Sequence, residues 1–208
     1  MKRFRVGMWM LLVALIGVGL LAVPTHAAVI FSDNFDSENG GVGVLTYSGF
    51  AKWTVSDGTV DLIGNGYYDF YLGNGLYVDL DGSTGNAGKM TSTDLVLGPG
   101  TYELKFLLGG NHRGGNDTVD VSVQIGFVSQ SYTLLSTDPL TAYSLLFTVA
   151  SSTTANIVFD HLGGDNIGII LDQVSLSSLN QVPEPGTLVL LGSGLLGLVG
   201  YGRRMLKK

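Results

Sequence analysis

The stretch TYELKFLLGG, Thr101 to Gly110, decides the fold class of this chain. Its apolar side chains recur at every second position, at Tyr102, Leu104, Phe106 and Leu108. Successive side chains of a β-strand point to opposite faces, whereas a helix would space its apolar residues three or four positions apart. The stretch therefore predicts a β-strand with one buried face.

Similar apolar runs of strand length recur along the middle of the chain. They are Trp53 to Val55, Val60 to Ile63, Leu76 to Leu80, Val119 to Ile125, Tyr143 to Val149, Ile157 to Phe159 and Ile167 to Leu176. Clusters of Gly, Asn, Asp and Ser separate them, and no long segment has a helical period. This spacing predicts an all-β domain, an antiparallel β-sandwich or jelly roll.

The last of these runs changes parity within itself. Its inward positions are Ile167, Ile169 and Leu171, followed by Val174 and Leu176. One extra residue must be accommodated near Asp172 and Gln173, and a β-bulge is the simplest way to do so.

Composition excludes several classes of function. The 208 residues include no cysteine, which excludes disulfides, thiolate metal sites and cysteine nucleophiles. From Val29 to Gln181, four basic side chains face 16 carboxylates, a net charge of −12. Such a surface repels nucleic acid and anionic lipid, so a nucleic-acid partner is not expected.

The first 28 residues have the layout of a secretory signal peptide. A basic head is followed by an apolar stretch from Val6 to Val23, which would form a signal helix, and by small residues at Ala27 and Ala28. We expect signal peptidase to cleave after one of these alanines. The alternative is an uncleaved amino-terminal anchor, and either arrangement exports the middle of the chain.

The carboxyl end, VPEPGTLVLLGSGLLGLVGYGRRMLKK, also points to a membrane. The 15 apolar or small residues from Thr187 to Tyr201 would make a helix of about 22 Å, short of the roughly 30 Å hydrocarbon core. With flanking glycines and snorkelling arginines, this becomes a marginal, short transmembrane helix. The basic tail would stay cytoplasmic, so we expect a transient anchor in the inner membrane.

This end resembles the PEP-CTERM sorting signal of Gram-negative bacteria. The matching residues are Val182, Pro183, Glu184, Pro185, Arg203 and Arg204. The resemblance implies an exosortase, a membrane-embedded transpeptidase or protease, as a partner that processes the chain near Pro-Glu-Pro. A plain anchor on a proline-rich stalk is the alternative. The expected organisation is a signal peptide at 1–28, an ectodomain at 29–181 and the sorting signal at 182–208.

The ectodomain resembles the sandwich domains common on PEP-CTERM proteins and, with them, galactose-binding-like folds and carbohydrate-binding modules. The segments that carry this resemblance are GLYVDLDGSTGNAG, LGPGTYELKFLLGGNHRG and GGDNIGIILDQVSL. It implies a structural calcium ion that ties the first strand to the last through Asp36 and Asp172, with backbone carbonyls completing the oxygen shell. The alternative is that these are exposed turn residues without an ion.

Two segments carry candidate sugar contacts. NGYYDFYLGNG holds Tyr67, Tyr68 and Tyr71, whose rings can stack on the C–H face of a pyranose. GGNHRGGND holds Asn111 and Arg113, which can bind a polar ligand or the carboxylate of a uronic acid. Two alternatives stay open: the rings can belong to the core, and Arg113, in a long hairpin loop, can simply pair with an acidic neighbour.

Catalysis is not expected. The ectodomain has only two histidines, His112 and His161, only two glutamates, Glu38 and Glu103, and no nucleophile or metal-hydrolase motif. We expect a non-catalytic protein of the cell surface or the extracellular biofilm matrix that associates with exopolysaccharide. The alternative is a structural or adhesive protein that contacts other proteins.

Overall fold

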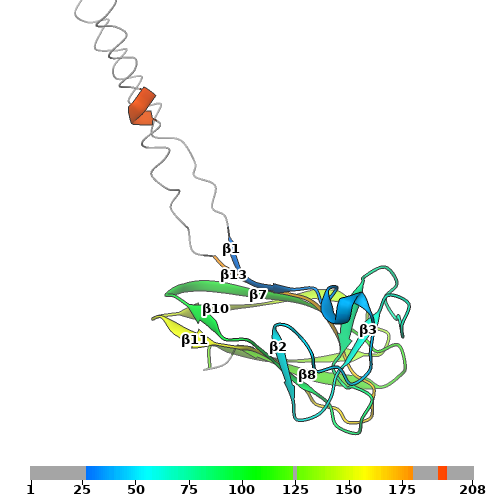
Figure 1. Cartoon of the computed structure of the whole chain (residues 1–208). Coiled ribbons are helices and arrows are strands. Elements are labelled where there is room, and N and C mark those ends of the chain that lie inside the picture. Colours follow the sequence, from blue (N-terminus) through cyan, green and yellow to red (C-terminus); the bar gives the residue numbers. More distant parts are fainter. Residues whose placement is uncertain (1–26, 124–125, 180–191, 196–208) are drawn as a thin grey trace, which may run out of the picture. The chain divides into compact units, whose positions relative to one another are not determined.

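The computed structural model describes residues 27–123, 126–179 and 192–195. Two antiparallel sheets pack face to face (Figure 1). The first has the order β10 (Thr141–Val149), β7 (Gly100–Gly109), β13 (Ile170–Ser178), β4 (Leu76–Asp79), β3 (Asp61–Gly64), and β1 (Ala28–Asp33) also pairs with β13. The second has the order β2 (Trp53–Ser56), β5 (Lys89–Ser92), β12 (Ile157–His161), β8 (Asn116–Val123), β9 (Val128–Leu135). The predicted all-β sandwich is confirmed.

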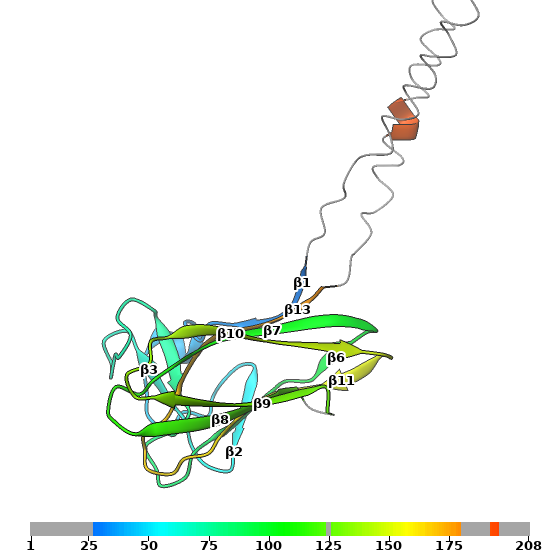
Figure 2. The ribbon, with the colours of Figure 1, turned by 180° about the vertical axis from the view of Figure 1, so that it is seen from behind.

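Three small elements complete the described fold. A two-stranded sheet pairs β6 (Leu95–Leu97) with β11 (Thr153–Ala155), and it lies at the end of the sandwich opposite β3 (Figure 2). A 3-10 helix, η1 (Glu38–Gly41), follows β1.

The core lies between the two sheets. Along β7, Tyr102, Leu104, Phe106 and Leu108 are buried, as the alternation predicts. The buried residues of β8 are Val119, Val121 and Val123. The rings of Phe106 and Phe159, on opposite sheets, meet edge to face with centroids 5.4 Å apart, a geometry that aromatic pairs favour.

The predicted bulge in β13 is also confirmed. The register of β13 against β7 shifts between Asp172 and Ser175, and Gln173 has a φ of 49° in the left-handed region. Val174 and Leu176 regain the core side after the shift, whereas Gln173 is exposed. The extra residue leaves the Asp172 side chain fully buried.

One expected connection is wrong. The segment between β7 and β8 was expected to be a hairpin loop, but these strands belong to different sheets, and it crosses from one to the other. The alternating pattern shows that both strands are half-buried and cannot show which strands pair. The crossing places Arg113 at the end of the sandwich near β3 and β4.

The described domain begins and ends at one place. β1 pairs antiparallel with β13, so Ala28 lies opposite Ser178 (Figures 1 and 2). Two predicted features lie outside the described residues. They are the signal helix and the sorting residues, Val182 to Pro185 with Arg203 and Arg204. Residues 192–195 form a single helical turn. Within the described ranges, no helix is long and apolar enough to cross a membrane.

Candidate functional site

A cleft with an aromatic wall lies among the loops at the β3 end of the sandwich. Its volume is about 260 Å³, and we call it the aromatic–arginine cleft. It is lined by Leu45, Asp61, Ile63, Tyr68, Phe70, Asp79, Ser83, Arg113 and Asn166. The segment after β3 provides the rings, and the loop after β7 provides the arginine. The two segments with predicted sugar contacts therefore meet at one place.

Arg113 is fixed in this cleft by a carboxylate and a ring. Its Nη2 donates to Oδ2 of Asp79 at 2.6 Å, and its guanidinium carbon lies 5.7 Å from the centroid of Phe70. The Asp79 side chain is 3% exposed and that of Arg113 is 37% exposed. Burial raises the pKa of Asp79 well above its usual range, and the charge of Arg113 opposes the rise. The pairing with an acidic neighbour is present, and the Arg113 side chain is still partly exposed to solvent.

Asn111 holds the arginine loop in shape. It is fully buried, and its Oδ1 accepts from the backbone N–H groups of Arg113 at 2.5 Å and Gly114 at 3.0 Å. Its Nδ2 donates to Gly114 O at 3.0 Å and to Asp117 Oδ2 at 2.6 Å. These bonds use the whole amide, so we assign Asn111 to the loop scaffold and not to direct ligand contact.

The three tyrosines named from the sequence have different surroundings. Tyr68 is 58% exposed and lines the cleft, whereas Tyr67 is 38% exposed and packs edge-on against Tyr68 with centroids 4.9 Å apart. The hydroxyl of Tyr71 lies within donating distance of the carbonyls of Gly110, at 2.8 Å, and Asp138, at 2.9 Å. Burial raises the pKa of Tyr71 to about 12. Tyr71 therefore belongs to the scaffold beneath the arginine loop.

Sequence reasoning missed Asp61, which is also in the cleft wall. Its Oδ1 accepts from the backbone N–H groups of Thr46 at 2.7 Å and Ser83 at 3.1 Å, and its Oδ2 accepts from Ser83 Oγ at 2.7 Å. Asp61 lies directly across the β3–β4 ladder from Asp79. The sequence places an aspartate at one end of each strand, but only the hairpin register puts them opposite each other.

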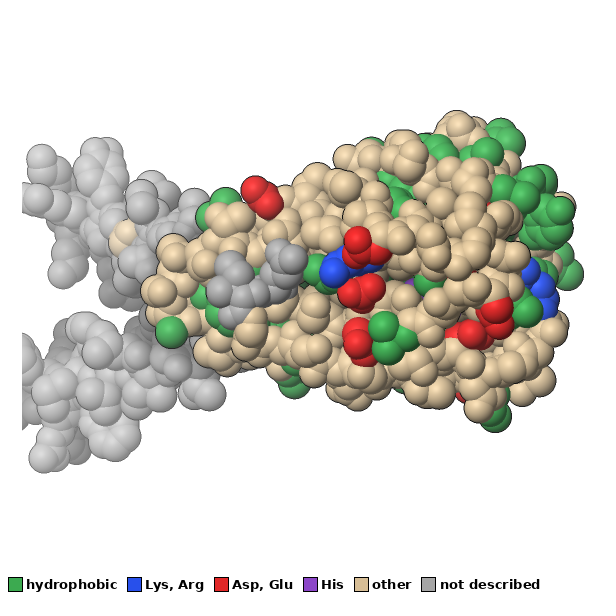
Figure 3. Space-filling model, turned by 90° about the horizontal axis from the view of Figure 1, so that it is seen from below, with side chains coloured by type: hydrophobic (Ala, Val, Ile, Leu, Met, Phe, Trp, Pro, Cys, Tyr) green, Lys and Arg blue, Asp and Glu red, His purple; other side chains and the backbone are tan. Residues whose placement is uncertain are grey.

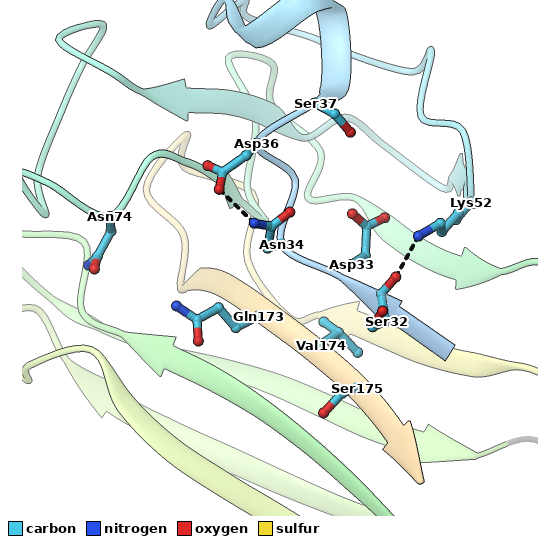
Figure 4. Close-up of a pocket in the computed structure, with 10 residues that line it drawn as sticks. All are labelled: Ser32, Asp33, Asn34, Asp36, Ser37, Lys52, Asn74, Gln173, Val174 and Ser175. Atoms are coloured by element: carbon cyan, nitrogen blue, oxygen red, sulfur yellow. Dashed lines mark hydrogen bonds between the residues drawn. The ribbon is translucent and has the colours of Figure 1, made fainter. Parts of the chain in front are cut away.

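The calcium candidates lie elsewhere, at or beside a polar hollow of about 450 Å³ that is lined in part by the paired strands β1 and β13 (Figure 4). It is lined by Ser32, Asp33, Asn34, Asp36, Ser37, Lys52, Asn74, Gln173, Val174 and Ser175. The two oxygens of Asp36 accept from Leu76 N at 2.9 Å and from Asn34 Nδ2 at 2.6 Å. Asp36 thus joins the turn after β1 to the start of β4.

Asp172 carries the strongest sign of a missing partner near this hollow. Its Oδ1 accepts from Gln173 N at 2.6 Å, but its Oδ2 is buried and has no hydrogen-bond partner in the described ranges. Burial raises the pKa of Asp172 to about 7, and the charges of Asp36 and Asp33 add to the rise. No three side chains of the His, Cys, Asp or Glu type converge on a metal position among the described residues. Asp36 and Asp172 fit a hard cation only if backbone oxygens or water supply the remaining ligands.

A third buried polar group lies close to the cleft. Asp81 is fully buried, and its Oδ2 accepts from the N–H groups of Gly164 at 2.7 Å and Asp165 at 3.1 Å. Nε2 of His161 accepts from Ile169 N at 3.2 Å, so the proton of a neutral ring is on Nδ1. Neither His161 Nδ1 nor Asp81 Oδ1 has a partner among the described residues.

Comparisons with known proteins agree with this fold and identify the carboxyl end. Residues 181–204 match the PEP-CTERM protein-sorting motif, so the predicted sorting signal is confirmed. This motif indicates export and sorting through the membrane toward the cell surface. No curated protein matches the chain.

Solved structures similar to this chain include carbohydrate-binding modules. The CBM22-1 xylan-binding domain from Paenibacillus barcinonensis Xyn10C is 10% identical, with a TM-score of 0.50, and the alignment covers 77% of this chain and 100% of that one. The CBM22-1-CBM22-2 tandem from the same protein is 12% identical, with a TM-score of 0.51 and coverage of 78% and 48%. At these identities, the likeness establishes the sandwich fold alone.

Proposed function

We propose that this chain is an exported, non-catalytic protein of the cell surface or extracellular matrix that binds exopolysaccharide in the aromatic–arginine cleft. One observation carries the proposal: the exposed ring of Tyr68 lines the same cleft as the Arg113–Asp79 pair. An aromatic face stacks on the C–H face of a sugar, while fixed charged groups bond its hydroxyls.

The cleft has the rigidity that such a site requires. Phe70 supports the guanidinium, Asn111 fixes the loop backbone, and Tyr71 joins the two cleft-forming segments. Because these groups are held before a ligand arrives, binding would order few side chains. Tyr68 and the exposed side of Arg113 would then make the direct contacts.

The test is calorimetric titration of the full chain, in a non-ionic detergent, with exopolysaccharide purified from the producing bacterium. Tyr68→Ala and Arg113→Ala should each weaken binding by about tenfold or more, the usual effect of removing a main contact. Val96→Ala is the matched control, because Val96 is 78% exposed on β6 at the opposite end of the domain. Glycan binding that is unchanged in both cleft variants would exclude this cleft as the site.

The export route is proposed from the two ends of the chain. Signal peptidase would remove residues 1–28, and an exosortase-type enzyme would process the carboxyl end near Pro183. Intact mass spectrometry of the protein recovered from the cell surface measures both ends. A mature chain that still includes Lys208 would contradict exosortase processing.

A structural calcium ion at Asp36 and Asp172 is proposed as part of this function. Asp172 Oδ2 would become a ligand of the bound cation, which would stabilise the folded state by mass action. We expect the melting temperature to fall in chelator for the wild type, and Asp172→Asn to remove this response. Asp57→Asn is the control, because the Asp57 side chain is 67% exposed. An equal melting temperature with and without calcium would rule out the ion.

A structural or adhesive role through protein contacts is the second candidate, and the sheet edges favour it. The edge strands β10 and β9 contain no charged residue and no proline, the residue types that usually protect an edge from pairing with another chain. Sedimentation of the wild type and Ser144→Lys tests this candidate, because a charge on β10 should weaken any assembly through that edge.

A further inference from the structure

We infer that the aromatic–arginine cleft selects glycans built from amino sugars with free amines, and that it rejects uronic acids. This inference rests on the proposed glycan binding, and it names the class of sugar. It replaces the expectation that Arg113 would bind a uronic carboxylate.

Two carboxylates in the wall of the cleft have different partners. Asp61 and Asp79 face each other across the β3–β4 ladder, and like charges in such positions repel each other. Arg113 compensates only Asp79, through the contact of 2.6 Å. Among the described residues, the hydrogen bonds to Asp61 come from neutral donors of Thr46 and Ser83, and Asp61 is 6% exposed. The wall of the cleft therefore holds a nearly buried carboxylate that has no cationic partner within the described part of the chain.

Further carboxylates around the cleft add to its negative charge. Burial raises the pKa of Asp79 and of Asp117; the charges of Asp61 and Asp81 add to the rise at Asp79, and those of Asp165 and Asp81 add to the rise at Asp117. Arg113 is the only arginine from residue 29 to residue 181. Its charge is opposed by several carboxylates, so the cleft is a region of negative potential.

The surface farther away reinforces this potential. On the face shown in Figure 3, acidic side chains are scattered over a largely uncharged surface and basic ones are few. Together with the net charge of −12 from residue 29 to 181, this surface disfavours the approach of a polyanion.

A protonated amine on the sugar ring would provide the missing charge. Oδ2 of Asp61 accepts one hydrogen bond, from Ser83 Oγ, and can still accept another, and an ammonium group has three donors. A neutral hydroxyl at the same ring position can donate to Asp61 but brings no charge. A uronate would instead place a second unpaired carboxylate beside Asp61.

The experiment uses three hexasaccharides on one β-1,4-linked backbone: cellohexaose, its 2-amino counterpart glucosamine hexamer, and its uronate counterpart cellouronic acid hexamer. Calorimetry of the full chain in non-ionic detergent at about pH 5 keeps most of the sugar amines protonated and the aspartates, with an ordinary pKa of about 3.9, largely ionised. In low salt, we expect the glucosamine hexamer to bind at least tenfold more tightly than cellohexaose. Salt should reduce the difference, because it screens exposed charges. The uronate should not bind.

Asp165→Asn separates the effect of charge from that of shape. Asp165 is exposed and does not line the cleft, and an asparagine can keep its hydrogen bond to Ile167 N. The variant should lower the preference for the amino sugar about two- to threefold in low salt. Asp94→Asn, the same change at an exposed aspartate just before β6, should not alter it.

The outcomes distinguish the inference from the function on which it rests. The inference is wrong, while glycan binding stands, if the uronate binds as tightly as cellohexaose or if the amine brings no gain. The inference is also wrong if Asp165→Asn leaves the preference for the amino sugar unchanged, as Asp94→Asn should. It is likewise wrong if none of the three hexasaccharides binds while the exopolysaccharide binds and Tyr68→Ala abolishes that binding, because the cleft would then take a different class of sugar. Absence of binding to all three hexasaccharides and to the exopolysaccharide would overturn the proposed function itself.

Discussion

His161 and Asp81 are two buried polar groups, and His161 Nδ1 and Asp81 Oδ1 both lack a hydrogen-bond partner among the described residues. Burial lowers the pKa of His161, while the charges of Asp81, Asp165 and Asp160 oppose the change. With Nε2 accepting from Ile169 N, the neutral ring directs its Nδ1–H into the interior. A protonated ring at this position would be a buried cation, which the surrounding protein disfavours.

This pair predicts acid sensitivity of the folded state. Because the folded pKa of His161 lies below its ordinary value of 6.5, the unfolded chain takes up the proton first as the pH falls. The free energy of unfolding should therefore decrease as the pH falls below about 6.5, and His161→Gln should remove this part of the decrease. Urea unfolding of both proteins from pH 8 to pH 5 measures the difference.

The control for this prediction is His112→Gln, because His112 is exposed. Asp172 acts in the opposite direction: its pKa is raised to about 7, so its protonation stabilises the folded state as the pH falls. The comparison must therefore be made between wild type and variant at each pH. Parallel curves for His161→Gln and the wild type would show that the ring does not resist protonation.

At the scale of single residues, the sequence showed which side chains lie in or near the candidate site better than it showed whether each contacts a ligand or supports the fold. Tyr68 and Arg113 were named as candidates, and they line one cleft. Asn111 and Tyr71 were named for the same task but are committed to the scaffold by hydrogen bonds that form between distant segments. Asp61 was missed, because its place opposite Asp79 depends on strand register.

At the scale of elements, the bulge in β13 separates two parts of the strand that have different partners. Before the bulge, it pairs with β4 and β7, and after it, with β1 and β7. Gln173 is in the left-handed region at a φ of 49°, a conformation that costs most residues about 1–2 kcal/mol and costs glycine little.

Two substitutions at this position should have opposite effects. Gln173→Gly should leave the free energy of unfolding unchanged or raise it, because glycine adopts a positive φ without strain. Gln173→Val should lower it by about 1–2 kcal/mol, because a β-branched side chain is disfavoured there. Urea denaturation measures both.

Ser175, two residues farther along the same strand, is the control for this prediction. It has regular pairing with Ser32 of β1. There the order should be reversed, with valine tolerated and glycine destabilising, as in an ordinary strand. If position 173 follows the order of position 175, the bulge does not hold this residue at a positive φ in solution.

The elements that the sequence predicted share a clear apolar period. β7, β8 and β10 alternate because one of their faces packs on the core. β9 was not predicted, since only Tyr132 and Leu134 of its eight residues are buried, and the rest of this edge strand is exposed or half-buried. β1, β5, β6 and β11 are short or polar, so tertiary pairing determines them.

At the scale of the whole domain, the topology separates the cleft from the two ends of the domain, Ala28 and Ser178. β13 runs from Ile170, which pairs with Asp79 of the cleft wall, to Ser178, which pairs with Ala28. Nine strand residues span about 26 Å at 3.3 Å per residue. Figures 1 and 2 likewise place the loops beside β3 away from the point where the described chain begins and ends.

This separation predicts that the domain can bind glycan while it is held by its carboxyl end. The chain has no cysteine, so a single introduced thiol defines one point of attachment. Leu179→Cys places it directly after β13, at a residue that is 41% exposed, whereas Leu72→Cys places it at an 85% exposed residue in the segment that carries Phe70. Each variant is coupled to maleimide beads and exposed to labelled exopolysaccharide.

Beads coupled through Leu179→Cys should capture the glycan as the free protein does, and beads coupled through Leu72→Cys should capture several-fold less, because the bead surface obstructs the cleft. Both variants must bind equally before coupling, which excludes a direct effect of the substitution. Adding Tyr68→Ala to the Leu179→Cys variant should abolish capture and exclude adhesion to the beads. Equal capture by both attachments would mean that the glycan binds at another face, and the cleft would lose its assignment.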